Sequence, residues 1–567
     1  MKKNFFLLIL FSLIAQWSMA QTPKWLDKSR RAVFSIVTYD NDDKILNTGN
    51  GFFISEDGIA LSDYSLFKGA QRAVVVDSDG KQLQVATIQG ANTMYDIVKF
   101  RVNVIGKKVS ALPVATTATD ADATVYLLPY STQKAATFTT GKVKEVSSIG
   151  DNQFYYSLTM KLDDKMVSCP VMNVNGQVIG LAQKSSGSDV DRVCYAIGAS
   201  YGQALTISPL SANDLNLKNI GIKKGLPETE EQALVYLYMS SGNLSANEYA
   251  ELLDEFITRY PNSADGYIRR ASNTMFLSID EASLDKVAAD MDRALSVSQK
   301  KDDVHYNLAK MIYTYQLTSP EKAYKDWTYD KALAEVRTAI TLDPLPVYTQ
   351  LEGDILYTKQ DYADAFASYE KVTKTNMVSA AVFFSAAKAK EMAKADLSEV
   401  IALMDSCIAY CTTPMTSDNA PFLLERARLY MEAKQYRPAM LDYDAYYDAV
   451  KGNVNDIFYY YREQASLYAK QFQRALDDIN KAIELSPDDV SYRAELAVVN
   501  IRVGRYGEAV KALEAAIGID AAYSEAYRLM GIAQIQLKQK DKACASFAKA
   551  KELGDPNADA LIEKHCK

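Results

Sequence analysis

The sequence predicts a multi-domain protein in which an all-β module is followed by an all-α repeat solenoid. Three observations support this fold class. Residues 32–204 consist of short β-rich runs punctuated by Gly, Asn and Asp, and residues 228–567 have a helical pattern throughout. The helical part also repeats itself at a constant spacing. With 567 residues, of which 48% are hydrophobic and 24% charged, the chain has the length and composition of a folded protein with several domains.

The first twenty residues have the pattern of a secretion signal. Lys2 and Lys3 precede an apolar run over residues 5–15, and residues 18–20 (Ser-Met-Ala) form a small-residue cleavage pattern. The apolar run is shorter than the ~20 residues that a transmembrane helix needs. We therefore expect an exported mature chain without a transmembrane segment. An N-terminal membrane anchor that is not cleaved is the alternative interpretation.

The exported chain is predicted to consist of a β module (residues 21–206), a linker (207–227) and the solenoid (228–567). Within the β module, the pair Asn175-Gly176 between two apolar runs predicts a two-residue hairpin, because a type I′ turn requires positive φ at both positions. Many short strands at this spacing favour a barrel or a sandwich. The strand-like runs begin at Ala32, Arg72, Asp96, Thr124 and Asn173.

The six cysteines fall into three sequence pairs, and an exported protein can form disulfides. The pairs are Cys169 with Cys194, Cys407 with Cys411, and Cys544 with Cys566. The first and last pairs are each separated by about two secondary-structure elements, so we expect a disulfide in both. The middle pair is spaced i, i+4, where a helix aims the two side chains poorly for a bridge. Metal binding by these thiols is disfavoured, because no third or fourth ligand lies nearby.

The helical part contains three segments that align with one another. They are QFQRALDDINKAIEL from Gln471, RYGEAVKALEAAIGI from Arg505, and QKDKACASFAKAKEL from Gln539. Alanines recur in two sets at steps of 34 residues, at Ala475, Ala509 and Ala543, and at Ala482, Ala516 and Ala550. This period resembles the tetratricopeptide repeat, a helix-turn-helix unit whose small residues let two helices approach closely. The resemblance implies roughly nine or ten units and a concave surface that binds a peptide or a partner protein.

Aromatic residues crowd one segment of this solenoid, residues 443–461. One interpretation is helix packing, because aromatic side chains dominate core burial. The other is a binding groove lined by tyrosines, whose hydroxyls offer polar contacts to a ligand. In the second interpretation the candidate binding residues are Tyr443, Tyr446, Tyr447, Tyr459 and Tyr460.

A second resemblance covers about 170 residues of the β module. The stretch TGNGFFISEDGIALSDYSLFKGA from Thr48 is similar to the first hairpin of trypsin-like serine peptidases of the high-temperature-requirement kind. YDIVKFRV from Tyr95 is similar to the aspartate strand of that family, and MVSCPVMNVNGQVIGLA from Met166 resembles its nucleophile loop and the following hairpin. The resemblance implies a trypsin-like double barrel, whose substrates are held by adding a strand to a sheet edge.

Two of the three catalytic positions of that family are occupied by other residues. Ser65 stands at the histidine position, Asp96 keeps the aspartate, and Val167 stands at the nucleophile position. A serine nucleophile needs a base to take its proton, and the aspartate only orients and stabilises that base. The two histidines of the chain, His305 and His565, both lie in the solenoid. The resemblance therefore implies a peptidase fold without peptidase activity.

An active serine peptidase with a rearranged site, directed to substrates by the repeats, is the alternative. Ser168 lies one residue from the nucleophile position, and Lys161 or Lys165 would have to serve as its base. A shift of one residue usually redirects a side chain, which disfavours this arrangement.

Other function classes find no support in the sequence. The net charge of -8 offers no basic surface for nucleic acid, and no phosphate-binding GxxxxGK[ST] motif or other cofactor motif occurs. The two widely separated histidines cannot form a clustered zinc site. We therefore predict no metal and no cofactor. The predicted function is an exported scaffold that binds a protein or an extended peptide in the envelope of a Gram-negative bacterium, in the periplasm or at the outer membrane, with secretion as the further option.

Overall fold

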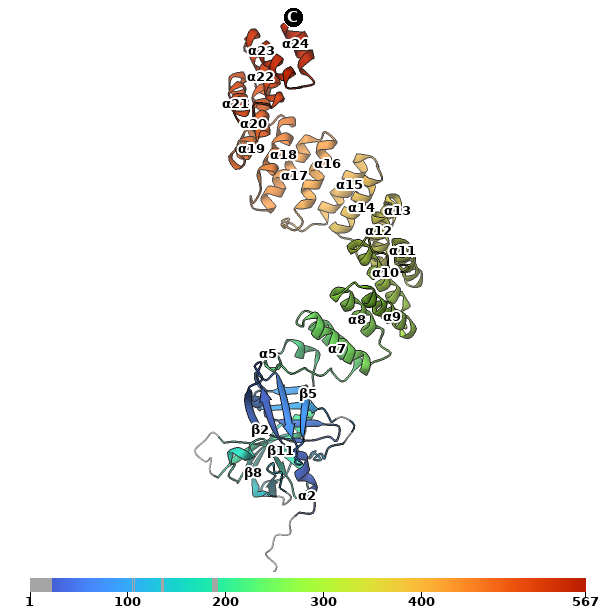
Figure 1. The fold of residues 1–567 in the computed structure, drawn as a ribbon, viewed down its shortest axis with the longest axis vertical. Coiled ribbons are helices and arrows are strands. Elements are labelled where there is room, and N and C mark those ends of the chain that lie inside the picture. Colours follow the sequence, from blue (N-terminus) through green and yellow to red (C-terminus); the bar gives the residue numbers. More distant parts are fainter. Residues whose placement is uncertain (1–22, 105, 107, 134–136, 186–191) are drawn as a thin grey trace, which may run out of the picture. The chain divides into compact units, whose positions relative to one another are not determined.

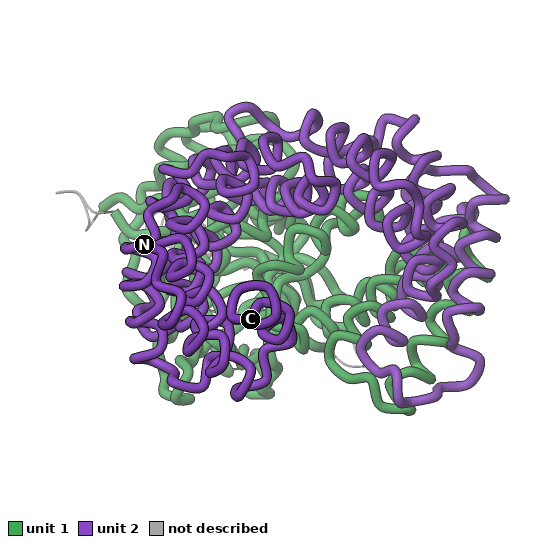
Figure 2. The backbone as a smooth tube through the Cα atoms, turned by 90° about the horizontal axis from the view of Figure 1, so that it is seen from above, with its two compact units in different colours: residues 1–298 green, residues 299–567 purple. Residues whose placement is uncertain are grey.

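The computed structural model describes residues 23–567 except 105, 107, 134–136 and 186–191 (Figure 1). The predicted secretion signal lies outside the described residues. The predicted fold class is confirmed, because two closed six-stranded antiparallel barrels are followed by an all-α region. By compactness the chain divides into two units, Met1–Ser298 and Gln299–Lys567, so this boundary falls inside the all-α region (Figure 2).

The first barrel closes in the order β1-β2-β3-β6-β5-β4. Its strands are β1 (Val33–Tyr39), β2 (Ile45–Phe53), β3 (Ile59–Ser62), β4 (Arg72–Val76), β5 (Gln82–Asn92) and β6 (Ile97–Val102). Burial alternates along most of β1, β4 and β6, as expected where one face of a strand points into a barrel. The ring centroids of Phe34 and Phe53 lie 4.7 Å apart in this core, and those of Phe67 and Phe100 lie 4.9 Å apart.

The second barrel closes in the order β10-β11-β12-β9-β8-β7. Its strands are β7 (Thr124–Leu127), β8 (Thr139–Gly150), β9 (Gln153–Leu158), β10 (Pro170–Met172), β11 (Val178–Gln183) and β12 (Cys194–Gly198). Short helices lie before, within and after the two barrels: α2 (Leu26–Ser29), η2 (Arg30–Ala32), α3 (Tyr64–Phe67), η3 (Asp164–Met166) and α4 (Ala199–Ala204).

The hairpin predicted at Asn175-Gly176 forms between β10 and β11, but its turn is not type I′. Of the two central residues only Gly176 has positive φ, at 78°. The side chain of Asn173 organises the turn instead, because its Oδ1 accepts hydrogen bonds from the backbone N–H groups of Asn175 and Gln177, both at 3.0 Å. Glycine is also required sterically, since a Cβ at this position would lie 2.5 Å from the Trp25 ring.

Residues 207–227, expected to be a linker, pack against the first barrel. They contain η4 (Pro209–Asn213) and α5 (Leu215–Lys218). The backbone N–H of Gly69 donates to Asn219 O at 2.7 Å, and Ile88 donates to Lys223 O at 2.8 Å. This segment is therefore ordered by backbone hydrogen bonds and does not act as a free tether.

The all-α region contains the helices α6 (Glu230–Ser240), α7 (Ala246–Arg259), α8 (Ala264–Leu277), α9 (Glu281–Val297), α10 (Lys301–Thr318), α11 (Tyr329–Leu342), α12 (Pro346–Thr358), α13 (Tyr362–Thr373), α14 (Ala380–Met392), α15 (Leu397–Ala409), α16 (Pro421–Glu432), α17 (Tyr436–Ala449), α18 (Asp456–Tyr468), α19 (Phe472–Leu485), α20 (Val490–Arg502), α21 (Tyr506–Ile519), α22 (Ser524–Gln536), α23 (Lys540–Glu552) and α24 (Ala558–Cys566). Among the described residues, no helix has both the length and the apolar character needed to cross a membrane.

Consecutive helices pack in pairs, from α8 with α9 to α22 with α23. The six alanines that recur at 34-residue steps are all fully buried, as the repeat pattern predicts. The turns within the last pairs repeat as well, because Lys470, Gly504 and Lys538 each adopt positive φ between two helices. The pairs number eight over the fully described residues 228–567, fewer than the nine or ten units expected, since α6 packs mainly against η4.

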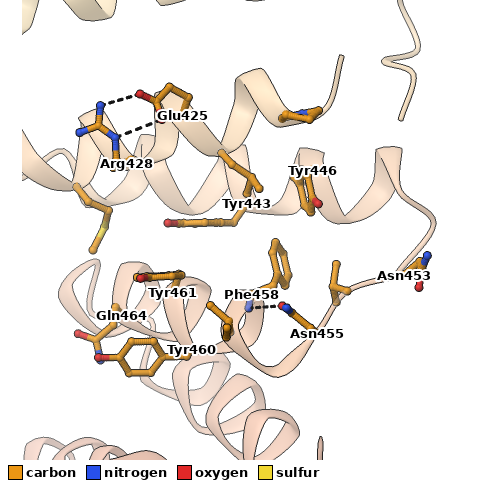
Figure 3. A pocket seen from close by; sticks show the side chains of 15 residues that line it. Glu425, Arg428, Tyr443, Tyr446, Asn453, Asn455, Phe458, Tyr460, Tyr461 and Gln464 are labelled. Atoms are coloured by element: carbon orange, nitrogen blue, oxygen red, sulfur yellow. Dashed lines mark hydrogen bonds and ion pairs between the residues drawn. The ribbon is translucent and has the colours of Figure 1, made fainter. Parts of the chain in front are cut away.

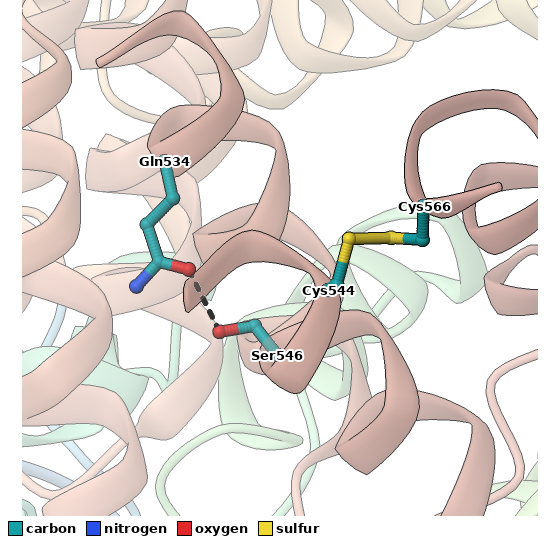
Figure 4. The surroundings of a disulfide bond; sticks show 4 residues. All are labelled: Gln534, Cys544, Ser546 and Cys566. Carbon is teal, nitrogen blue, oxygen red and sulfur yellow. Dashed lines mark hydrogen bonds between the residues drawn. A yellow bond between two sulfur atoms is a disulfide. The ribbon is translucent and has the colours of Figure 1, made fainter. Parts of the chain in front are cut away.

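One of the two expected disulfides is present and the other is not. Cys544 on α23 and Cys566 on α24 are joined, with their Cα atoms 5.6 Å apart (Figure 4). Cys169 and Cys194 are instead free and buried. Strand β11 lies between β10 and β12, so the two cysteines are separated by two strand spacings, about 10 Å, which exceeds the roughly 7 Å limit for a disulfide.

Cys407 and Cys411 are also free thiols. Cys407 lies in the last turn of α15 and Cys411 lies two residues beyond its end, where the Cys411 thiol donates a hydrogen bond to the Cys407 carbonyl, with Sγ 3.4 Å from the oxygen. This contact points the Cys411 sulfur at the backbone and not at the other sulfur.

Candidate functional site

The positions expected at the catalytic centre lie around α3 and η3, and two of them are in direct contact. The backbone N–H and the hydroxyl of Ser65 both donate to the Asp96 carboxylate, at 2.7 and 3.0 Å. Ser65 is exposed on α3, and Asp96 precedes β6 with a positive φ of 46°. The carboxylate therefore holds the first turn of a helix, and the group that it orients is a hydroxyl that is no base at neutral pH.

The loop after η3 brings a different pair together. Val167 is half-buried at the nucleophile position, and the next residue, Ser168, is 1% exposed with a positive φ of 63°. The Ser168 hydroxyl donates to Oδ2 of Asp63 at 2.5 Å. Lys161 and Lys165, the two bases considered for Ser168, are exposed. The hydroxyl of Ser168 is thus directed into the protein, toward a carboxylate.

Asp63 was missed in the sequence, and its carboxyl is strongly perturbed by burial. Burial raises the pKa of its carboxyl to about 7, the nearby Asp96 charge adds to this, and the hydrogen bond from Ser168 opposes it. Among the described residues, its Oδ1 is buried without a hydrogen-bond partner. No sequence signal marked Asp63, because its partner lies 105 residues away on the second barrel.

Asn50 of β2 holds the same loop from the first barrel. Its Nδ2 donates to the carbonyl oxygens of Lys165 and Val167, each at 3.0 Å. With the Asp63–Ser168 bond, the loop is fastened to the first barrel at both ends. The carbonyl groups of this loop are therefore used in hydrogen bonds between the two barrels.

Neither histidine is near these positions in the chain. The Nδ1 atom of His305 on α10 lies 2.6 Å from Oε2 of Glu335 on α11. His565 on α24 stacks on Phe547, with ring centroids 6.2 Å apart. Among the described residues, no group of three or more His, Cys, Asp or Glu side chains is placed to hold a metal ion.

A second candidate site is a pocket of about 1010 Å³ formed by α16, α17, α18 and the loop between the last two (Figure 3). Such a volume is at the upper end of the roughly 300–1,000 Å³ typical of ligand pockets. Three of the predicted binding tyrosines line it, namely Tyr443, Tyr446 and Tyr460. The other lining residues are Pro421, Leu424, Glu425, Arg428, Met431, Asn453, Val454, Asn455, Ile457, Phe458, Tyr461 and Gln464.

The remaining two predicted tyrosines have a structural role. Tyr447 and Tyr459 surround the guanidinium of Arg462, whose Cζ lies 4.9 and 5.6 Å from their ring centroids. Arg462 in turn makes two hydrogen bonds to the buried Asp478, at 2.7 and 3.0 Å. In the aromatic segment, some rings thus pack against Arg462 while others face the pocket.

Four pocket residues of α18 were not predicted as binding residues, although the sequence carried a signal for them. Ile457, Tyr461 and Gln464 share one helix face with Tyr460, at the spacing i, i+3, i+4 and i+7. Phe458 closes the pocket beside them and stacks on Tyr446, with centroids 5.4 Å apart. Helical periodicity applied to the aromatic segment would have placed Ile457, Tyr461 and Gln464 on the face of Tyr460 and Tyr459 on another face.

Comparisons with known proteins give two kinds of match. Residues 49–181 match the family model of the trypsin-like peptidase domain. DnaJ homolog subfamily C member 7 of Mus musculus is 29% identical over 105 residues, which are 18% of this chain and 21% of that protein. Small glutamine-rich tetratricopeptide repeat-containing protein 2 of Saccharomyces cerevisiae is 26% identical over 95 residues, 17% of this chain and 28% of that protein.

Protein SGT1 homolog of Bos taurus is 30% identical over 87 residues, 15% of this chain and 26% of that protein. The chain thus spans between a fifth and three tenths of the length of these curated relatives. Together with the barrel topology, the family match confirms a trypsin-like double barrel followed by an all-α region.

Proposed function

We propose that the chain is an exported scaffold whose repeat region binds a protein or an extended peptide, and whose trypsin-like domain, of the high-temperature-requirement kind, has no peptidase activity. The observation that carries the binding function is the tyrosine-lined pocket of α16–α18. It is concave, lined by both apolar and polar side chains, and built on the helices of a repeat array, the kind of surface that such arrays use for partners. The relative whose name includes tetratricopeptide repeats supports this assignment.

The absence of peptidase activity follows from the chemistry of the catalytic positions. Val167 offers no nucleophilic atom, and Ser65 offers no base to activate one. Asp96 is engaged by Ser65. A carboxylate, a hydroxyl and an isopropyl group cannot reproduce the proton transfer that acyl transfer requires.

Export is proposed from the N-terminal pattern of charged, apolar and small residues. The Cys544–Cys566 disulfide supports it, because such bonds persist in oxidising compartments. We place the protein in the periplasm or at the outer membrane of a Gram-negative bacterium.

Crosslinking in intact cells tests the binding function. The full chain and its Tyr461→Ala variant are expressed at equal levels, crosslinked, purified and compared for the proteins that they capture. We expect a defined partner with the wild type that is lost in the variant, because Tyr461 is 52% exposed and lines the pocket. Tyr468→Ala is the matched control, since Tyr468 is similarly exposed at 49% but lies outside the pocket. Identical capture by all three proteins would exclude the pocket as the binding surface.

An active peptidase with a rearranged site is the second candidate, and the short Ser168–Asp63 contact is the observation in its favour. A fluorophosphonate, which labels activated serines, separates the two functions. We expect no labelling, since Ser168 is 1% exposed and its hydroxyl is directed inward. Labelling of the wild type that disappears in Ser168→Ala would establish the peptidase instead.

A further inference from the structure

We infer that the pocket of α16–α18 binds an uncharged, proline-rich peptide segment in the extended polyproline II conformation. This inference rests on the proposed function and names the class of ligand for the same pocket. Three properties of the pocket carry it: its aromatic lining, the pairing of its charges, and the tyrosine hydroxyls along its walls.

Aromatic rings line the pocket from two helices. Tyr443 projects from α17 and Tyr461 from α18, and Figure 3 shows both rings edge-on, one above the other. Tyr446 and Phe458 extend this surface as a stacked pair with an interplanar angle of 29°. Aromatic-lined grooves of this kind hold the flat, apolar rings of proline, and a polyproline II segment loses little conformational entropy on binding because it is already extended.

The charged groups of the pocket are paired with one another. Arg428 donates to Glu425 at 2.7 and 3.3 Å and also contacts Glu432 at 3.3 Å. Lys388 contacts Glu425 from α14 at 2.9 Å. A charged side chain or a terminal carboxylate of a ligand would therefore meet no cation without an existing partner, which favours a ligand segment without charge.

Four tyrosine hydroxyls line the pocket, and each can donate a hydrogen bond as well as accept one. Among the described residues, the hydroxyls of Tyr443, Tyr446, Tyr460 and Tyr461 have no hydrogen-bond partner. Burial raises the pKa of Tyr443 to about 12 and raises that of Tyr460, so these hydroxyls keep their protons at neutral pH. A proline residue has a carbonyl acceptor but no N–H, so a proline-rich segment presents acceptors to these donors.

Fluorescence anisotropy of a fluorescein-labelled decaproline peptide with the full chain tests the inference. We expect saturable binding of decaproline and no binding of a ten-residue Gly-Ser peptide with the same label. Tyr461→Ala should raise the Kd at least tenfold, because it removes the exposed aromatic ring that α18 contributes to the pocket. Tyr461→Phe should raise it only a few-fold, since the ring stays and one hydroxyl donor is lost. Tyr468→Ala, whose ring stacks on Tyr436 outside the pocket, should leave the Kd unchanged.

Two results would overturn the inference: no binding of decaproline by a folded wild-type chain, or binding that Tyr461→Ala does not weaken. Binding of maltohexaose or chitohexaose with the same dependence on Tyr461, in place of decaproline, would show that the ligand is a glycan. The crosslinking experiment tells these failures apart from a failure of the proposed function. If Tyr461→Ala abolishes partner capture while decaproline does not bind, the scaffold function stands and only the class of ligand is wrong.

Discussion

The hydroxyl of Ser168 donates a 2.5 Å hydrogen bond to the carboxyl of Asp63, and this bond joins the two barrels at the loop where a peptidase would carry its nucleophile. Asp63 lies just after β3 of the first barrel, and Ser168 lies just before β10 of the second. Both side chains are buried, at 5% and 1% exposure. The contact therefore has the position of a catalytic interaction but the burial of a structural one.

We predict that Asp63→Asn removes a pH dependence of the stability. Burial raises the pKa of Asp63 to about 7 in the folded protein, against about 3.9 in an unfolded chain. Between these values the folded state keeps a proton that the unfolded state releases. The free energy of unfolding of the wild type therefore falls as the pH rises, by about 1.4 kcal/mol per pH unit from this group, and the contribution is gone above pH 7.

The amide of Asp63→Asn does not titrate, so the variant lacks the loss of stability that Asp63 causes in the wild type as the pH rises. The stability of the variant relative to the wild type should therefore increase from pH 4 to pH 7. Urea unfolding at several pH values measures this difference. Asp151→Asn is the control, because Asp151 is an exposed carboxylate in the turn between β8 and β9. Equal pH slopes for the wild type and Asp63→Asn would contradict the prediction.

Asp96→Ala should destabilise the first barrel by about 1–2 kcal/mol, the usual cost of losing a helix-capping side chain. Its carboxylate accepts two hydrogen bonds from Ser65, and its positive φ of 46° is less favourable for alanine. Ser65→Ala removes only the hydroxyl bond of an exposed residue and should cost about 1 kcal/mol or less. Thermal unfolding of both variants measures the order of the two effects. A larger loss in Ser65→Ala would show that Asp96 does not hold α3.

Arg462→Ala should destabilise the repeat region by about 3–5 kcal/mol, because it leaves the buried Asp478 without its partner. The control is Arg474→Ala, since Arg474 pairs with the more exposed Asp444 and such pairs contribute about 1 kcal/mol or less. Urea unfolding followed by circular dichroism at 222 nm measures both losses. Similar losses of stability in the two variants would contradict the prediction that the buried ion pair contributes more than the exposed one.

The cysteines allow a direct chemical count. Thiol titration of the denatured, unreduced exported chain should give four thiols, and prior reduction should give six, because only Cys544 and Cys566 are joined. Replacing both by alanine should cost about 3 kcal/mol for this sequence separation of 22. Hydrogen exchange should then increase in α24, which the bond fastens to α23. A count of two thiols before reduction would show a second disulfide, and peptide mapping would tell whether it joins Cys169 to Cys194.

Most of the fold could be predicted from local patterns in the sequence. The alanines spaced 34 residues apart are fully buried between helices, and the runs from Ala32 and Arg72 form β1, β4 and β5. Such patterns are readable because helices and strands expose one face at a fixed period. The hairpin at Gly176 was predicted with the wrong turn, since side-chain hydrogen bonds from Asn173 determined its geometry.

The sequence by itself determined that this protein has an all-β module without histidine and a helical repeat region, because these are properties of composition and local periodicity. Only the tertiary structure decided that Asp63 meets Ser168, that Cys169 and Cys194 stay apart, and that Tyr461 faces a pocket while Tyr459 packs on Arg462. Each of these depends on which strands and helices become neighbours in space. That choice is made by the packing of the whole core, where residues distant in the chain compete for the same contacts.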